Sequence, residues 1–129
     1  MRTQFHIALV LLAAISLQGC GKSDRITTYP VTGSVTLGGN PIEQGSIVFD
    51  PADGQGTSAM GGIEKGQFTA QVPAGEKILR LSAVRTTGEK DQYGALVSES
   101  YIPAKYNLES QITKTVKPDE ENKFDLTLD

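Results

Sequence analysis

The sequence contains one thiol and one imidazole, the side chains most often used as nucleophile and base. Cys20 is the only cysteine among the 129 residues, and His6 is the only histidine. A single thiol excludes an intramolecular disulfide, and exported proteins seldom keep an unpaired cysteine. Because both residues lie in the first twenty positions, the rest of the chain contains neither a thiol nor an imidazole.

A serine nucleophile after His6 would therefore need lysine as its base. Ser82 with Lys77 and Ser110 with Lys114 are such pairs, but neither stands in a motif of nucleophilic catalysis. We expect these serines at solvent-facing positions of strands, and we predict no catalytic residue.

Two acidic clusters could bind a cation. Asp50 and Asp53, in the sequence Asp-Pro-Ala-Asp-Gly, carry oxygens of the kind that Ca²⁺ binds. Their spacing matches no calcium loop, and Asp-Gly is a favoured turn pair. The run Asp119–Glu121 is typical of a solvated loop. We expect both clusters in turns, and we predict no metal site and no cofactor.

Three tyrosines, Tyr93, Tyr101 and Tyr106, complete the candidates. Tyrosine has an apolar body and a polar tip, which suits either a packed corner position or a ligand contact. Tyr106 follows Lys105 in a segment that we expect to cross between two sheets. We favour a packed tyrosine there, with a ligand-facing role as the alternative.

The first 19 residues have the pattern of an export signal. Arg2 supplies a positive start, and an apolar run from Phe5 to Leu17 is broken only by His6 and Ser16. A helix of that length spans about 20 Å against roughly 30 Å of bilayer hydrocarbon, which disfavours a membrane-spanning helix. We predict a signal helix over residues 1–19 that is removed, with an uncleaved anchor or a buried helix as the alternative.

Residues 17–20, Leu-Gln-Gly-Cys, resemble the bacterial lipobox, in which an aliphatic residue and a small residue precede an obligate cysteine. The resemblance implies that Cys20 is the lipidation site and carries two or three palmitate-type acyl chains. Two or more chains hold a protein firmly at a membrane. Residues 20–28 are then a short polar tether, of which eight residues reach at most ~27 Å. Lys22 is not the Asp that retains such proteins at the inner membrane, which favours the outer membrane.

Length and charge restrict the remaining classes of function. A chain of 129 residues suggests one folded domain, which we place at residues 29–129. The formal net charge is −3, and no basic stripe is present, so we predict no nucleic-acid partner. Fourteen glycines and six prolines indicate short elements joined by many turns.

From residue 29 the hydrophobic pattern has a period of two, which predicts β-strands. Val31, Val35 and Leu37 share one face of the first strand, and Phe124, Leu126 and Leu128 share one face of the last. Seven strands are predicted, at residues 31–37, 45–50, 57–63, 67–72, 77–85, 112–117 and 123–128. Seven short strands with regular turns favour a two-sheet sandwich over a barrel. The segment Thr86–Ser100 fits either a flexible loop or an extra edge strand.

An ordered set of motifs resembles the transthyretin-like, or carboxypeptidase regulatory-like, domain of small bacterial lipoproteins. The matching residues are Val31-x-Gly33-x-Val35, Gly39-x-Pro41, Gly45-x-Ile47-x-Phe49-x-Pro51, Gly66-x-Phe68, Val72-Pro-Ala-Gly75, Ile102-Pro-Ala-Lys-Tyr-Asn107, Ser110-x-Ile-Thr113 and Asn122-x-Phe-Asp-Leu126. The resemblance implies a seven-stranded Greek-key β-sandwich of the prealbumin type. It implies no peptidase activity, because this domain is the non-catalytic partner in carboxypeptidases.

These observations predict an exported envelope lipoprotein, anchored to a bacterial membrane through Cys20. Its sandwich is expected to be a non-catalytic module that contacts an envelope protein or a glycan. A structural, envelope-maintaining lipoprotein without a discrete ligand site is the first alternative. A carbohydrate-active or metal-dependent enzyme is the second, and mutation of Asp50 or Asp53 would test it.

Overall fold

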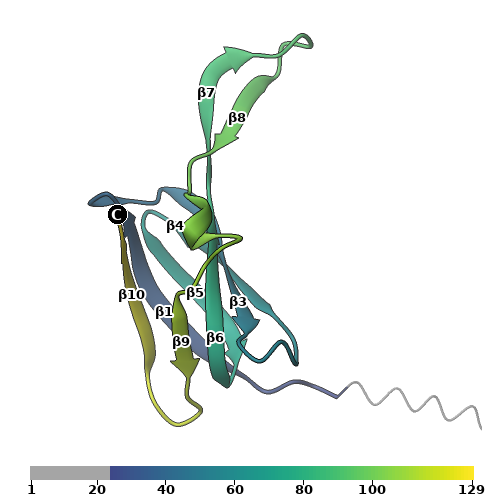
Figure 1. Ribbon diagram of the computed structural model, residues 1–129, viewed down its shortest axis with the longest axis vertical. Helices are drawn as coiled ribbons and strands as arrows, with labels where there is room; N and C mark the ends of the chain where they lie inside the picture. The colour runs from purple at the N-terminus through teal and green to yellow at the C-terminus, as the bar shows by residue number, and fades with distance from the viewer. Residues whose placement is uncertain (1–23) are drawn as a thin grey trace, which may run out of the picture.

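The computed structural model describes residues 24–129, and these residues form an all-β structure (Figure 1). The ten strands are β1 (Thr28–Leu37), β2 (Asn40–Pro41), β3 (Gln44–Pro51), β4 (Ala59–Glu64), β5 (Gln67–Pro73), β6 (Gly75–Ser82), β7 (Val84–Lys90), β8 (Leu96–Ser100), β9 (Thr113–Val116) and β10 (Asn122–Leu128). A single 3₁₀ turn, η1 (Ala104–Tyr106), follows β8. The predicted signal helix and Cys20 lie outside the described residues.

The all-β prediction is confirmed, and the number of strands is larger than predicted. The seven predicted strands correspond to β1, β3, β4, β5, β6, β9 and β10. The strand predicted at residues 77–85 is divided at Ala83, where β6 ends and β7 begins. The three additional strands are β2, which has two residues, and the paired strands β7 and β8.

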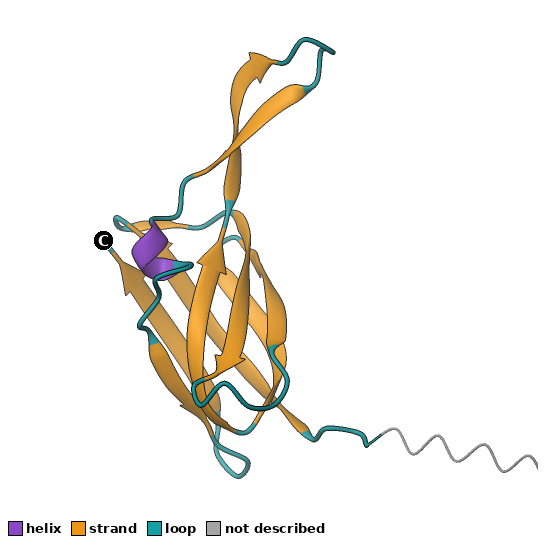
Figure 2. Cartoon of the chain, turned by 45° about the vertical axis from the view of Figure 1, so that its right-hand side comes forward, coloured by secondary structure: helices purple, strands orange, loops and turns teal. Residues whose placement is uncertain are grey.

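Eight strands form one curled sheet in the order β10-β1-β5-β4-β3-β6-β9, with β2 paired to β1 (Figures 1 and 2). All neighbours are antiparallel except β1 and β10, which run parallel with Val35 opposite Leu126. The terminal strands of this order are β10 and β9. Asn122, at the start of β10, connects them through hydrogen bonds to Lys117, which follows β9. Its side chain accepts a hydrogen bond from the Lys117 amide and donates one to the Lys117 carbonyl, both 2.9 Å long.

The apolar residues at alternate strand positions form one core inside the curl. Val31, Val35, Ile47 and Phe49 are completely buried, as the period of two predicts. On β5, Phe68 is buried between exposed neighbours, and its ring lies 6.2 Å from the ring of Phe49. Burial of such side chains is the main stabilising contribution to a domain of this size.

Two glycines are required by the way the strands meet. A Cβ at Gly33 would lie 1.9 Å from the carbonyl oxygen of Phe124, so only glycine lets β1 approach β10. Lys65 and Gly66, with φ of 51° and 76°, form the two-residue turn between β4 and β5. Two consecutive positive φ values match the twist of a tight hairpin, for which glycine is the favoured residue.

Residues 84–100 form a hairpin of their own. Strands β7 and β8 pair with each other in a two-stranded sheet that projects from the body (Figure 2). The segment Thr86–Ser100 is therefore neither a flexible loop nor an edge strand of the main sheet. Its strand residues have few apolar side chains to bury, so they extend into solvent rather than joining the core.

Candidate functional site

The β7–β8 hairpin is the candidate site that the structure favours. All seven residues of β7 are exposed, and so are most residues of β8. Three large apolar side chains are exposed on it, Val84 at 62%, Tyr93 at 85% and Leu96 at 57%. Single exposed apolar residues are common, but three on one projecting element make it the candidate contact surface.

The tip of the hairpin is organised around Asp91. The Asp91 carboxylate accepts hydrogen bonds from the amides of Tyr93 and Ala95, at 2.8 and 3.0 Å. The Asp91 amide donates to the Ala95 carbonyl, and the Gly94 amide donates to the Asp91 carbonyl. These bonds hold the backbone that presents Tyr93, so less conformational freedom is lost when the ring is bound.

The base of the hairpin is held by a charged pair over an aromatic ring. The Arg85 Nε lies 2.8 Å from a carboxylate oxygen of Glu99. The Arg85 guanidinium carbon also lies 5.5 Å from the centre of the Tyr101 ring, a cation–π distance. Tyr101, one of the predicted candidates, therefore contributes to the base of the hairpin.

The hairpin lies at the end of the molecule opposite to the point where the described chain begins (Figure 1). Thr28 at the start of β1 is paired with Pro73 at the end of β5, and Gly75 begins β6 close by. Strand β6 then runs the length of the body and leads through Ala83 into β7.

The acidic pair Asp50 and Asp53 takes part in internal bonds. Asp50 accepts hydrogen bonds from the Ser58 hydroxyl and from Arg80 Nε, the latter at 2.8 Å. The Ser58 hydroxyl, followed by the Arg80 guanidinium, holds the pKa of Asp50 below its usual value against the opposing effect of burial. Asp53 accepts from the Gln55 amide, as a turn aspartate does.

The second acidic cluster, Asp119–Glu121, lies in the turn between β9 and β10, as predicted. Glu120 forms an exposed ion pair with Lys117 at 3.1 Å. Within residues 24–129, no three Asp, Glu, His or Cys side chains are grouped so that they could hold a metal ion.

The two serine–lysine pairs are not joined by any hydrogen bond in the described part of the chain. The Ser82 hydroxyl accepts a bond from the Asn107 amide group at 2.8 Å. The Ser110 hydroxyl is buried and donates to the Leu79 carbonyl, so the prediction of a solvent-facing position is wrong for Ser110. Both hydroxyls tie the segment after η1 to β6.

Tyr106 is half-buried and bonded to the last residue of the chain. Its hydroxyl donates to the Asp129 carboxylate, and the Asp129 amide donates back to it at 3.1 Å. Lys105 lies 3.3 Å from the same carboxylate. The hydrogen bond from Tyr106, followed by that from Lys105, lowers the pKa of Asp129. This arrangement agrees with the packed tyrosine that the sequence favours.

The sequence did not predict a hydrogen-bond network around Arg80. Arg80 donates to Asp50 and also to the carbonyls of Asn107 and Leu108, each at 2.8 Å. Asn107 in turn donates to the Leu81 carbonyl at 2.8 Å. The signal in the sequence was limited to an arginine between Leu79 and Leu81. The network fixes the path by which the chain returns from the hairpin to the body.

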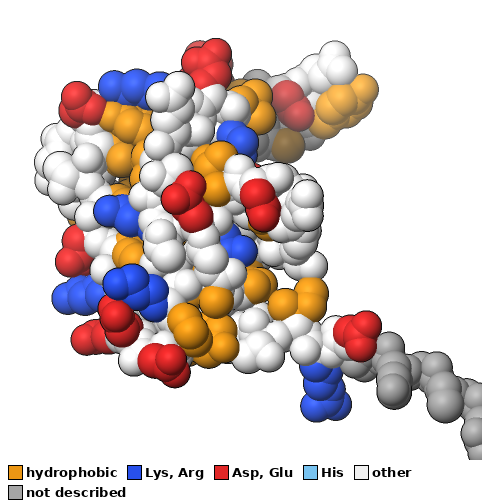
Figure 3. All heavy atoms as spheres, turned by 60° about the horizontal axis from the view of Figure 1, so that its bottom comes forward, with side chains coloured by type: hydrophobic (Ala, Val, Ile, Leu, Met, Phe, Trp, Pro, Cys, Tyr) orange, Lys and Arg blue, Asp and Glu red, His pale blue; other side chains and the backbone are white. Residues whose placement is uncertain are grey.

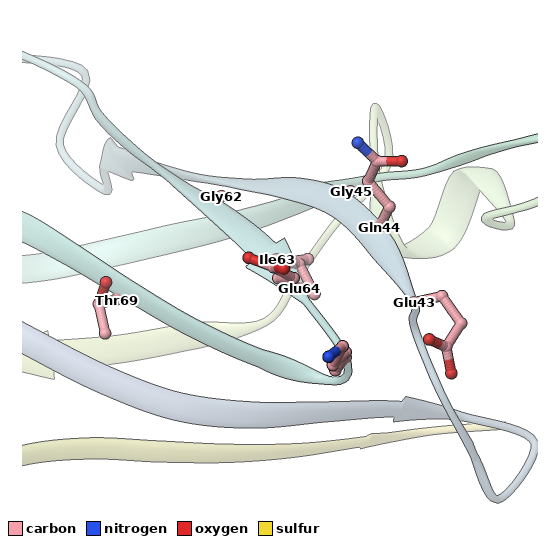
Figure 4. Close-up of a pocket in the computed structure, with 8 residues that line it drawn as sticks. Glu43, Gln44, Gly45, Gly62, Ile63, Glu64 and Thr69 are labelled. Carbon is pink, nitrogen blue, oxygen red and sulfur yellow. The ribbon is translucent and has the colours of Figure 1, made fainter.

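A depression of about 680 Å³ lies on the outer face of the main sheet, at the ends of β3 and β4 (Figure 4). Its polar lining residues do not converge on one point. The amide of Gln44 and the carboxylate of Glu43 point in opposite directions, and Thr69 lies apart from both (Figure 4). The geometry does not place two of these groups on one ligand atom, so we do not assign a site to it.

Charges are interspersed on the surface of the body. On the face seen in Figure 3, acidic and basic side chains alternate with uncharged ones, and no broad region has one sign. Among residues 24–129, no helix is long and apolar enough to cross a membrane.

Comparisons with known proteins give little information for this chain. No protein-family model matches it, and no curated protein matches it. Among solved structures, a 9R-lipoxygenase from Cyanothece PCC8801 aligns with 15% identity and a TM-score of 0.36. The alignment covers 79% of this chain and 16% of the lipoxygenase chain, and a likeness at that level carries no argument about fold or function.

Proposed function

We propose that this chain is an envelope lipoprotein, anchored to a bacterial membrane through Cys20, whose β-domain is a non-catalytic interaction module. The observation that carries the proposal is the β7–β8 hairpin, which projects from the body and exposes Val84, Tyr93 and Leu96. Exposed apolar and aromatic side chains on a preorganised loop favour a protein partner over a glycan.

The two ends of the module suit this role. Seven residues separate Cys20 from the beginning of β1, so the body would lie close to the bilayer. Strands β6 and β7 extend about 26 Å and 23 Å at the rise of a β-strand, in the direction away from the tether. The proposed anchor and the proposed contact surface are thus at opposite ends, with the hairpin pointing away from the membrane. We propose that this membrane is the outer membrane.

We further propose that the curled sheet is a Greek-key sandwich of the prealbumin type. Strands β10, β1, β5 and β4 would form one layer, and β3, β6 and β9 the other. The burial of residues from both groups of strands supports this division. Val31 and Val35 of β1 and Leu79 and Leu81 of β6 are all completely buried in one core. Two facing layers bury the residues of both inner faces in this way.

The anchor is tested by Cys20→Ser. We expect the variant to appear in the soluble fraction or to accumulate as a precursor, whereas the parent chain stays with the membrane. A Cys20→Ser chain that is processed and remains membrane-bound would contradict the anchor.

The module is tested by removing the hairpin while keeping its base. Replacement of residues 86–98 by Asn-Gly joins Arg85 to Glu99 through a tight turn, because these two residues are directly paired. Affinity capture from membranes, with Cys20 intact in both chains, should recover a specific protein with the parent and lose it with the shortened variant. Recovery of no specific protein with either chain would favour the alternative of a structural lipoprotein without a discrete ligand site, and identical recovery with both chains would contradict the hairpin as the contact surface.

A further inference from the structure

We infer that the free edge of β8 binds an extended peptide segment of a partner protein, which adds to the hairpin as a third strand. This inference rests on the proposed function, because it specifies how the hairpin makes its contact.

The hydrogen bonds of the hairpin show which residues of β8 point outward. At one end the Tyr101 amide donates to the Ala83 carbonyl, and at the other the Asp91 amide donates to the Ala95 carbonyl. Between them the Val97 carbonyl accepts from the Thr87 hydroxyl on β7. Inward and outward residues alternate along a paired strand. The backbone groups of Leu96, Ser98 and Ser100 therefore face the free edge, where a paired strand would satisfy them.

Of the features that normally prevent edge pairing, this edge has only its short length and the charge of Glu99, which is paired with Arg85. Residues 96–100 form a regular strand without proline, lysine or a bulge, which are the usual protections. The opposite edge of the hairpin is interrupted, because the register shifts between Thr86 and Lys90 and Gly88 has a φ of 83°. The outer strands of the main sheet carry Lys114 on β9 and Lys123 on β10.

One face of the hairpin determines what kind of peptide would fit. Directly paired residues share a face, so Leu96, Ser98 and Ser100 lie beside Thr86 and Val84. Arg85 and Glu99 lie on the opposite face and bind each other. The edge would thus accept a strand with apolar side chains at alternate positions.

Lys90 adds a charge at one end of this face. It is paired with Leu96 across the hairpin, and it forms no ion pair within residues 24–129. A strand added beside Leu96 would lie in the same row, within reach of the long lysine side chain. Charge complementarity therefore favours a partner segment with an acidic residue at that end.

A second copy of this chain fits the edge less well. If two β8 strands paired antiparallel about Ser98, Ser100 would lie opposite Leu96, and no carboxylate would face Lys90. A stable interface also takes roughly 20–30 residues from each side, whereas β8 supplies five. A single extended peptide needs no larger area, because main-chain hydrogen bonds supply much of the affinity in strand addition.

The inference is tested with a displayed library of random peptides, selected on the full chain in detergent. We expect enriched peptides to alternate apolar and polar residues and to carry an acidic residue near one end. Selection on Lys90→Glu should exchange that acidic residue for a basic one. Enriched peptides without alternation, or no enrichment, would overturn the inference.

Ser98→Pro is the decisive variant, because it removes an amide that faces the free edge and is not needed for pairing with β7. We expect it to weaken binding of a selected peptide at least about ten-fold, while Ser98→Ala, which keeps the amide, binds like the parent. Equal binding by Ser98→Pro and the parent would contradict edge pairing.

Amide hydrogen exchange of the unmutated chain gives a second test that does not depend on a variant. Bound peptide should protect the amides of Ser98 and Ser100 more than those of Val97 and Glu99, and equal protection would contradict the inference. Loss of capture on removing the hairpin, together with retained capture by Ser98→Pro, would leave the proposed function in place and remove only the edge pairing.

Discussion

The main sheet and the β7–β8 hairpin are made of the same kind of short strand, yet they differ in what holds them. In the main sheet, residues such as Phe49 and Leu81 are completely buried and belong to one core. In the hairpin every residue of β7 is exposed, and order comes from backbone pairing, the Asp91 tip and the Arg85–Glu99 pair. Two strands without a core are marginally stable alone in water. Because the hairpin buries so little, we expect it to contribute little to folding, which agrees with its proposed role as a contact surface.

The largest difference should appear when one aromatic residue is removed from each region. Phe49→Ala deletes a completely buried ring that packs against Phe68, which should cost about 3–5 kcal/mol of unfolding free energy. Tyr93→Ala removes a ring that is 85% exposed and should change stability by less than about 0.5 kcal/mol. Urea unfolding measures both. Similar losses for the two variants would show that the hairpin is part of the cooperative core.

The next effect compares two arginines that each bind a carboxylate. Arg80→Ala leaves the carbonyls of Asn107 and Leu108 without their charged donor, and we expect a loss of about 2–3 kcal/mol. Arg85→Ala breaks an ion pair whose arginine side chain is 65% exposed, which should cost no more than about 1 kcal/mol. A larger loss of unfolding free energy for Arg85→Ala than for Arg80→Ala would contradict the greater stabilising contribution of the Arg80 network.

Acid should weaken the body through Asp50. Its pKa in the folded state lies below the usual 3.8, so folding favours the ionised carboxylate. The stabilisation is fully present above that usual value and is lost as the pH falls through the lower pKa of the folded state. We expect unfolding free energy to decrease below about pH 4 and Asp50→Asn to reduce that dependence. Asp53→Asn serves as the control, and an equal reduction there would contradict the role of Asp50.

The smallest change should follow from removing the hairpin itself. The chain in which Asn-Gly replaces residues 86–98 should keep the unfolding midpoint of the parent within the effect of a surface substitution, about 0.5 kcal/mol. Thermal and urea unfolding measure this. A loss of several kcal/mol would mean that the hairpin stabilises the sheet.

The sequence predicted the body better than the hairpin, for a physical reason. Alternation in β1, β5 and β10 reports burial on one face, and burial is what the core of the main sheet provides. The residues of the hairpin bury little, so their pattern carries no such signal. The strand predicted at residues 77–85 shows that alternation does not report where one strand ends and the next begins. Alternation continues through Ala83, whereas the neighbouring strand changes from β3 to β8.

The candidate residues divide in the same way. Local turn chemistry placed Asp53 and the run Asp119–Glu121 correctly, because a turn depends on neighbours in sequence. The bonds from Arg80 to Asn107 and Leu108 join residues far apart along the chain, and no local pattern encodes them. Cys20, the residue on which the proposed anchor depends, lies outside the described residues and stays a prediction.

Photocrosslinking in living cells tests whether the hairpin is the contact surface. A photoreactive amino acid is placed at Tyr93 on the hairpin or, as the control, at Met60 on the body, which is 69% exposed. With Cys20 intact, we predict that Tyr93 gives one crosslinked protein of constant size and Met60 gives none. Equal products from both positions, or products from Met60 alone, would contradict the account of the hairpin as the contact surface.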